Sequence, residues 1–392
     1  MGNEIELSSV ITDIAAGPFG SNLRVECFVP YGFPIIDGAN LKGYKVTDNL
    51  TKFVTEEKAR SLSRSIAHRG DVVVTISGTL GQIAYIPEDS MFEEYLCSQR
   101  QFRVSFDKSK VYVPYLVFYF HTFEGQNKIL SFANQTGVPA LSQPLKNFKK
   151  IRLCLPEYPT QKKIASIIEA FNDKIECNQK INDNLAVLLQ TVYQERFGDV
   201  DKAVEQGVLS DICSYSKDRV AVSELDVSTY FSTENMLPRK AGSTEATSLP
   251  TTPQTTACHK GDTLISNIRP YFKKIVYCED ECGCSTDVLC FMPNQPQYSA
   301  YLFSTLYADK FFAFMVAGAK GTKMPRGDKQ RIMTYPIVLP SEVALAEFNI
   351  IALPLIKQIY SNRAENKRLS LLRDTLLPKL MSGELDVSDI DL

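Results

Sequence analysis

A long amphipathic segment at residues 161–197 constrains the fold most, because the sequence repeats it near the C-terminus. No proline or glycine interrupts this segment, so we expect one continuous helix, with Thr160 as its N-cap and Gly198 as its stop. Its apolar residues recur at spacings of four and three, which is typical of a helix that packs along one seam against a partner helix. The seam residues are Ile164, Ile168, Phe171, Ile175, Leu185, Leu189 and Val192.

The gap in this seam falls at Asn178 and Asn182, and polar seam residues fix register and partner orientation at some cost in stability. A shift of 184 residues carries the pattern onto a second segment that starts near Ser341. Pro354 predicts an irregular helix or a new start within that segment, and Pro378 with Gly383 predicts its end. The repeated seam positions are Phe348, Leu355, Ile359, Asn362, Leu369 and Leu376.

The repeat extends upstream of both helices. Residues 137–156 align with residues 321–340 at the same shift, and the segment from Gly70 resembles the segment from Gly261 at a shift of 191. A period this long indicates a tandem duplication. We therefore expect an α+β chain of two mixed globular domains and two long helices that pair antiparallel about a pseudo-twofold axis. The expected divisions are residues 1–155, 156–198, 199–339 and 340–392.

Composition is that of an ordinary water-soluble protein, with 392 residues, 44% hydrophobic and 22% charged. Uninterrupted apolar runs are far shorter than the roughly 18 residues that span a bilayer, and the N-terminus has no basic and apolar leader. We expect a cytoplasmic protein, no membrane partner, and reduced thiols at the ten cysteines.

Two hairpins occupy matching places in the two globular domains. The strand–turn–strand pattern at residues 70–86 puts Ser77, Thr79 and Gln82 near a hairpin tip. Earlier, residues 17–23 have the glycines and proline of a tight exposed turn, and residues 115–132 predict an apolar helix. The second hairpin tip carries different side chains: Asn267, Arg269, Tyr271, Lys273 and Lys274.

The net charge of −2 conceals three basic segments, at residues 99–110, 146–152 and 320–331. Any one of them could be a solvated face, but two lie in matching parts of the repeat. Motifs for zinc proteases, nucleotide-binding loops, dinucleotide binding and adenine methylation are absent. A cysteine cluster at residues 278–290 lacks paired Cys-x2-Cys spacing, so we expect neither a metal nor a cofactor, and no catalytic residue.

Several segments together resemble the specificity subunits of type I restriction-modification enzymes. The resemblance covers essentially the whole chain, although Leu345 stands in the second helix where Gln161 stands in the first. The segments that carry it are GPFGSNL at 17–23, LPEYPTQKKIASIIEAFNDKI at 155–175, YFSTENMLP at 230–238, GDTLISNIRPYFKK at 261–274 and LLPKLMSGEL at 376–385.

The resemblance implies a non-catalytic DNA reader with two target-recognition domains. Each domain would read half of a bipartite double-stranded site. The helices would set the spacing and bind two methyltransferase subunits, with restriction subunits as further partners. A helix of residues 164–196 would be about 50 Å long at about 1.5 Å per residue. Two alternatives remain: a coiled-coil scaffold without a DNA role, and a reader module of a fused methyltransferase or nuclease.

We expect DNA contacts at exposed tips and basic loops of both domains. Arg269 is the candidate for a base contact, because a guanidinium can form two hydrogen bonds to a guanine edge. Lys273 and Lys274 are candidates for phosphate contacts, which position the protein without specifying sequence. The full set is Ser21, Asn22, Arg24, Ser77, Thr79, Gln82, Arg100, Asn134, Gln135, Asn267, Arg269, Tyr271, Lys273, Lys274, Lys320, Lys323 and Arg326.

Overall fold

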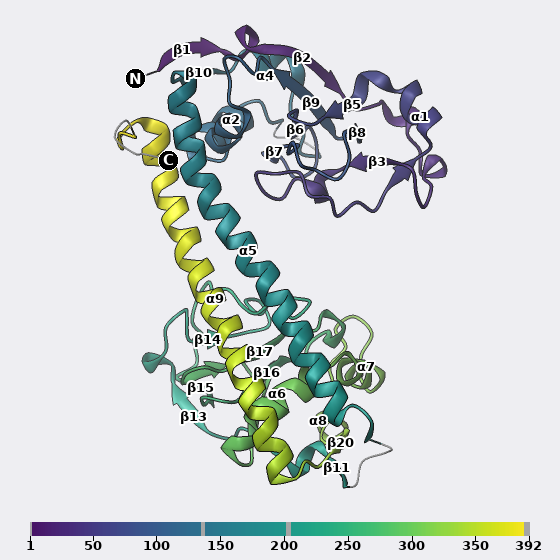
Figure 1. Cartoon of the computed structure of the whole chain (residues 1–392), viewed down its shortest axis with the longest axis vertical. Coiled ribbons are helices and arrows are strands. Elements are labelled where there is room, and N and C mark those ends of the chain that lie inside the picture. Colours follow the sequence, from purple (N-terminus) through teal and green to yellow (C-terminus); the bar gives the residue numbers. More distant parts are fainter. Residues whose placement is uncertain (1, 135–137, 201–204, 388–392) are drawn as a thin grey trace. The chain divides into compact units, whose positions relative to one another are not determined.

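The computed structural model describes residues 2–134, 138–200 and 205–387 (Figure 1). The chain forms two compact units. Unit 1 comprises residues 1–175 and 368–392, and unit 2 comprises residues 176–367. Each unit therefore contains one globular part together with a portion of both long helices. The fold is a mixed α and β fold, as the sequence predicted.

Unit 1 contains two four-stranded sheets. The first has the order β2-β9-β6-β7 and the second the order β4-β3-β8-β5. The first sheet consists of β2 (Ile11–Ala16), β9 (Gln101–Phe106), β6 (Val72–Thr75) and β7 (Ile83–Tyr85). The second consists of β4 (Phe53–Val54), β3 (Phe33–Ile36), β8 (Glu94–Cys97) and β5 (Ile66–His68).

Strand β6 shows why the first sheet lies between two cores. Successive side chains of a strand point to opposite faces. Val72 and Val74 join the core beneath the helices, whereas Val73 joins the core shared with the second sheet. All four residues of β6 are buried: three valines and Thr75 at the end of the strand.

The apolar stretch at residues 115–132 is two helices, α2 (Val113–Phe120) and α3 (Phe123–Leu130), and the prediction of one helix was wrong. Thr122 caps α3 by accepting a hydrogen bond from the Gly125 backbone. A side chain at Gly125 would overlap the Tyr119 carbonyl, so only glycine permits this close turn. Two further short helices, α1 (Glu56–Ser61) and α4 (Pro144–Lys149), complete the globular part.

Unit 2 repeats the first sheet with the same order of strands, β12-β19-β16-β17. In its second sheet, β13-β15-β18-β14, strand β18 has a parallel neighbour, β14, and an antiparallel neighbour, β15, as β8 has in unit 1. The edge strand differs: β13 pairs with the antiparallel neighbour, whereas β4 of unit 1 pairs with the parallel neighbour β3. The strands are β12 (Cys213–Tyr215), β19 (Val288–Pro293), β16 (Thr263–Ser266), β17 (Ile275–Tyr277), β13 (Arg219–Ala221), β15 (Gln254–Cys258), β18 (Cys282–Cys284) and β14 (Tyr230–Phe231). Its helices are α6 (Ser299–Tyr307), α7 (Asp309–Ala317) and α8 (Lys329–Ile332).

A two-stranded ribbon closes each globular part just before its long helix. β1 (Asn3–Glu6) pairs with β10 (Arg152–Leu155), and β11 (Gln206–Val208) pairs with β20 (Pro336–Val338). The following helices are α5 (Tyr158–Phe197) and α9 (Glu342–Ser382). Thr160 therefore lies inside α5 and is not its N-cap, which corrects the sequence prediction.

Helix α9 is continuous through Pro354 and Pro378, contrary to the expected break and to the expected end at Pro378. A proline inside a helix removes one backbone hydrogen bond, and packing of the same helix can outweigh that loss. Phe348, Ala352 and Ile356 on the turns around Pro354 are buried in the core of unit 2. The helix ends before Gly383, whose φ of 76° is readily adopted by glycine.

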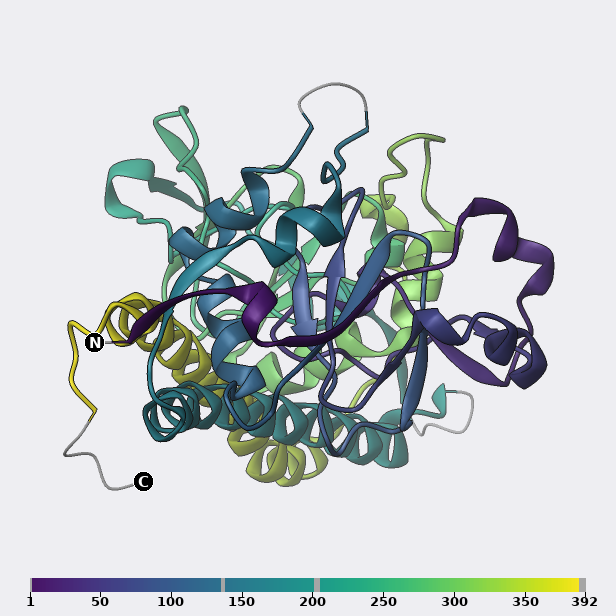
Figure 2. The ribbon, with the colours of Figure 1, turned by 90° about the horizontal axis from the view of Figure 1, so that it is seen from above.

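In unit 1, the first part of α5 packs against the last part of α9 and against α2 (Figures 1 and 2). Ile164 and Ile168 are buried with Leu377 and Leu380. Gln161 is fully buried and makes three hydrogen bonds, to the Tyr112 backbone N–H and to the carbonyls of residues 110 and 156. The corresponding Leu345 of α9 instead contributes to an apolar core, so the two helices start differently.

In unit 2, asparagines connect α5 and α9. Asn362 donates to the Asn182 side chain at 2.8 Å, and Asn178 donates to Asn366 at 2.8 Å and to Glu365 at 2.7 Å. The seam asparagines therefore bond across the helix pair. Apolar residues of both helices lie in the same core nearby.

One part of α9 is long and apolar enough to cross a membrane by length and composition, and 28% of that stretch is buried. The sequence argument counted uninterrupted apolar runs and so missed it. This is weak evidence for a membrane span, because a core helix of a water-soluble protein can pass the same test.

Candidate nucleic-acid interface

The first hairpin tip follows β6 and is fastened to the rest of unit 1. Gln82 accepts a hydrogen bond from Thr75 at 3.0 Å and donates to the Gly38 carbonyl at 3.0 Å. Ser77 forms a β-bridge with Ala140, and the Gly78 N–H donates to the Pro139 carbonyl at 3.0 Å. The tip is therefore rigid, with Gln82 engaged in holding it and Thr79 exposed.

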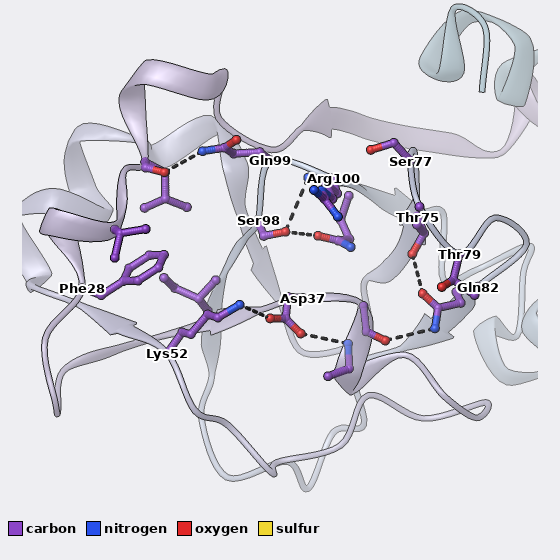
Figure 3. A pocket seen from close by; sticks show the side chains of 17 residues that line it. Phe28, Asp37, Lys52, Thr75, Ser77, Thr79, Gln82, Ser98, Gln99 and Arg100 are labelled. Atoms are coloured by element: carbon purple, nitrogen blue, oxygen red, sulfur yellow. Dashed lines mark hydrogen bonds and ion pairs between the residues drawn. The ribbon is translucent and has the colours of Figure 1, made fainter. Parts of the chain in front are cut away.

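A cavity of about 690 Å³ opens beside this tip (Figure 3). Four of the predicted site residues line it: Ser77, Thr79, Gln82 and Arg100. The chain brings three distant segments together here, at residues 23–52, 75–82 and 98–101. Sequence spacing alone could not place these segments side by side.

Sequence reasoning missed several polar residues of this cavity. Lys52 forms an ion pair with Asp37 at 2.6 Å, and the Ala39 N–H also donates to Asp37. Burial acts to raise the pKa of Asp37, but the bonds from Lys52 and from the Ala39 backbone bring it below its ordinary value. The carboxylate and ammonium thus form a charged pair on the cavity wall, and no motif around either residue indicated it.

The turn at residues 98–101 presents a second cation to this cavity, besides Lys52. Ser98 bonds to Gln101, and Gln99 donates to the carbonyls of Gly20 and Leu23. These bonds hold the turn and leave the exposed Arg100 side chain between them (Figure 3). A polar run, Ser-Gln-Arg-Gln, at the start of a buried strand was the available sequence signal.

The glycine-rich turn at residues 17–23 begins at Gly17, where the backbone lies close to another segment of the same chain. A side chain at Gly17 would lie 1.8 Å from the Ser98 carbonyl oxygen, so glycine is required there. Ser21, Asn22 and Arg24 follow on an exposed segment and do not line the cavity themselves. Asn134 is exposed on the loop that meets the hairpin tip, and Gln135 lies outside the described residues.

Unit 2 brings its second hairpin tip and a basic loop together. Ile268 pairs with Arg326, and the Arg269 N–H donates to the Pro325 carbonyl at 2.8 Å. Arg269 is exposed, has a φ of 50°, and reaches the Lys323 carbonyl at 3.5 Å. Tyr271 is half exposed at 50%. This arrangement corresponds to the pairing of Ser77 with Ala140 in unit 1.

The basic side chains of this loop differ in their engagement. Arg326 pairs with Asp287 at 3.0 Å, and Lys320 pairs with Asp328 at 2.7 Å. Lys323 is exposed on the same loop, and no hydrogen bond or ion pair of its side chain is found among the described residues. Asn267 is buried, and its Oδ1 has no hydrogen-bond partner among the described residues.

Lys273 and Lys274 are bound within the protein. Lys273 and Lys240 both contact Asp309 at 2.8 Å, and Lys274 donates to the Thr233 carbonyl. Burial lowers the pKa of Lys274. A phosphate contact at either lysine would have to share or replace these bonds, which sequence reasoning did not foresee.

We expect the Asp309 cluster to make stability sensitive to acid. Hydrogen bonds from Lys240 and Lys273 lower the pKa of Asp309 to about 2 from an ordinary 3.8. A lowered folded-state pKa stabilises the fold above the unfolded pKa and loses that effect as the pH falls through the folded value. Asp309→Asn should therefore lower the urea midpoint at pH 7, and the difference from wild type should shrink between about pH 4 and pH 2. A difference that is the same at pH 7 and pH 2 would contradict this expectation.

The cysteines at residues 278–290 lie in the apolar core between the two sheets of unit 2. Cys278 and Cys282 have their sulfurs 3.5 Å apart, and Cys258 joins the same core. Within residues 2–134, 138–200 and 205–387, no group of three or more His, Cys, Asp or Glu side chains is arranged to hold a metal ion. These thiols pack as small core side chains.

Comparison with known proteins finds relatives of one kind. Residues 30–186 match the type I restriction modification DNA specificity domain. The chain is 22% identical over 364 residues to the type I restriction enzyme MjaIX specificity subunit of Methanocaldococcus jannaschii, across 86% of this chain and 82% of that protein. The chain carries a type I DNA specificity domain and resembles a type I specificity subunit over most of its length. The resemblance inferred from the sequence is thereby confirmed.

A solved type I specificity subunit shares this fold. The crystal structure of the S subunit from M. genitalium matches with a TM-score of 0.59 and 15% identity, over 97% of this chain and 96% of that one. Members of this family are DNA-recognition subunits without catalytic activity, so the chain is a non-catalytic DNA-recognition protein. The scaffold without a DNA role and the fused enzyme are set aside.

Proposed function

We propose that this specificity subunit reads a bipartite double-stranded DNA site, with one half-site at each hairpin tip. The observation that carries the proposal is the repeated construction of the two tips. Each unit pairs its hairpin loop, after β6 or β16, with a second loop. An exposed arginine lies on the second tip, Arg269, and another lies beside the first tip, Arg100 on the turn before β9. Because the scaffold repeats while the tip side chains differ, the two half-sites should have different sequences.

We further propose that α5 and α9 form an antiparallel pair with pseudo-twofold symmetry, which sets the spacing between half-sites. The asparagine bonds of unit 2 support it. A shift of 184 residues carries Asn178 onto Asn362 and Asn182 onto Asn366, so the bonds Asn178–Asn366 and Asn182–Asn362 exchange under the proposed axis. Bonds made at both equivalent positions are what a twofold relation requires.

The outer faces of both helices are proposed to bind two methyltransferase subunits, with restriction subunits as additional partners in the cytoplasm. Val187 on α5 is 66% exposed, and Ile350 and Leu371 on α9 are 75% and 69% exposed. Large exposed apolar patches on a protein surface mark sites of protein–protein contact. Binding of DNA needs no cofactor in this chain.

Methylation mapping tests the proposal. Cells that express this chain with its methyltransferase subunit should carry methylated bases within one bipartite sequence, and cells without the chain should not. Exchanging residues 267–274 and 318–328 for those of a homologue with another target should change one half-site only. A single continuous target, or a change in both half-sites, would contradict the proposal.

A further inference from the structure

A second cavity of unit 1 lies away from the proposed DNA interface, between the globular part and the first half of α5. Its volume is about 320 Å³, which falls in the range of small-ligand sites. Three tyrosines, Tyr85, Tyr112 and Tyr158, line it together with the carboxylate of Glu169 from α5. The proposed reading of DNA makes no use of this cavity.

The carboxylate of Glu169 is held in place by two phenols. Tyr85 Oη lies 3.4 Å from Oε1, and Tyr112 Oη lies 3.4 Å from Oε2. Burial raises the pKa of Glu169 above its ordinary value, and the nearby Lys45 opposes this effect. Among the described residues Glu169 has no ion-pair partner within 4.0 Å.

The two lysines that line the cavity are already neutralised. Lys45 pairs with Asp173 at 3.1 Å, and Lys108 pairs with Glu88 at 2.7 Å. Asp89 adds a further exposed carboxylate to the lining. Glu169 and Asp89 are therefore the lining charges without an ion pair among the described residues, and Glu169 is the more buried of the two.

Aromatic rings form walls suited to a cation. The Tyr112 and Tyr158 rings are 6.2 Å apart and nearly perpendicular, at 86°. Ring faces attract ammonium and guanidinium groups, most strongly where water is excluded. Lys162 lies 6.0 Å from the Tyr112 ring, which shows that this ring already accepts a cation nearby, although Lys162 does not line the cavity.

Unit 2 supplies an internal comparison. The 184-residue shift places Leu353 of α9 where α5 has Glu169, and Leu353 lines a cavity of about 400 Å³ that also contains Tyr277. The Tyr277 hydroxyl there bonds to Ser299 at 2.7 Å. The equivalent helix position in unit 2 thus has no carboxylate, and the carboxylate of that cavity is Asp262 from another element, so packing of this fold does not need a glutamate on the helix.

We propose that the Tyr85–Tyr112–Glu169 cavity binds the guanidinium or ammonium group of a basic side chain from a protein that covers this face of α5. The proposal rests on the proposed function, because the methyltransferase subunit is the protein expected on α5. A carboxylate and aromatic faces together select a cation over a neutral side chain of the same size. A free polyamine carries the same chemistry, and the experiment separates the two sources.

The test measures binding of the separately purified methyltransferase subunit of the same system to the full chain. Glu169→Gln keeps size and hydrogen bonding but removes the charge, and it should weaken binding about tenfold or more, as expected for loss of a charge-assisted hydrogen bond. Glu195→Gln is the matched control, because it makes the same change at an exposed position of α5. It should bind as wild type does.

Ethylguanidinium and spermidine serve as probes of the chain alone by ligand-observed NMR. Binding of ethylguanidinium to wild type that Glu169→Gln abolishes supports the cation site. Failure of the wild-type chain to bind a methyltransferase subunit would overturn the proposed docking and leave the cation site standing. Equal methyltransferase binding by Glu169→Gln and wild type overturns a partner side chain as occupant. Glu169-dependent binding of spermidine in that case would assign the cavity to a free polyamine, and binding of neither probe would overturn the site.

Discussion

Replacing Phe348 by alanine is expected to lower the free energy of unfolding by about 3–5 kcal/mol, the usual cost of deleting a fully buried phenylalanine ring. Phe348 of α9 has no exposed surface. The centroid of its ring lies 5.4 Å from that of Phe197 of α5 and 6.5 Å from that of Tyr301 of α6. The ring thus joins both helices to the globular part of unit 2. The substitution should loosen all three elements together.

Denaturation in urea, followed by circular dichroism, measures this effect. Val343→Ala is the control, because Val343 lies on the same helix with 68% of its surface exposed, and surface substitutions usually change stability by less than about 0.5 kcal/mol. A loss below about 1 kcal/mol at Phe348 would mean that α9 does not depend on this core.

Arg269→Ala is expected to weaken binding to the cognate DNA by about 1–3 kcal/mol and to relax the choice at one base pair. Arg269 is exposed beside the loop that contains Arg326. Its backbone is left-handed, and its N–H donates a hydrogen bond to the Pro325 carbonyl, which fixes the turn that carries the side chain. A side chain fixed in this way can distinguish bases. Once methylation mapping has identified the target, affinities for single-base variants of each half-site measure the effect.

Lys323→Ala is the control for Arg269. Its side chain is exposed on the neighbouring loop, and only its backbone carbonyl contacts Arg269, so the substitution leaves that contact in place. Loss of a phosphate contact should weaken all sequences alike and reduce the salt dependence by about one ion. If Arg269→Ala showed this uniform loss with base preference intact, Arg269 would be a backbone contact instead.

Local pattern was enough to predict the elements that repeat along the chain. The seam spacing predicted both long helices, and alternating apolar residues predicted the hairpins β6–β7 and β16–β17. Such patterns are readable because each helix or strand buries one set of positions at a regular interval. The motifs around residues 17–23 and 155–175 carried the family, which the comparisons confirmed.

Tertiary packing decided what local pattern could not. Helix α9 continues through Pro354 because burial of Phe348 and Ala352 outweighs one lost hydrogen bond, whereas the apolar stretch at residues 113–130 divides because Thr122 and Gly125 favour a turn. The first cavity draws Asp37, Lys52 and Arg100 from separate turns next to strands, and the carboxylate that binds Lys273 lies 36 residues away at Asp309. Which polar side chains stay available for DNA depends on these long-range pairs, since an ion pair between distant residues leaves no periodic signal in the sequence.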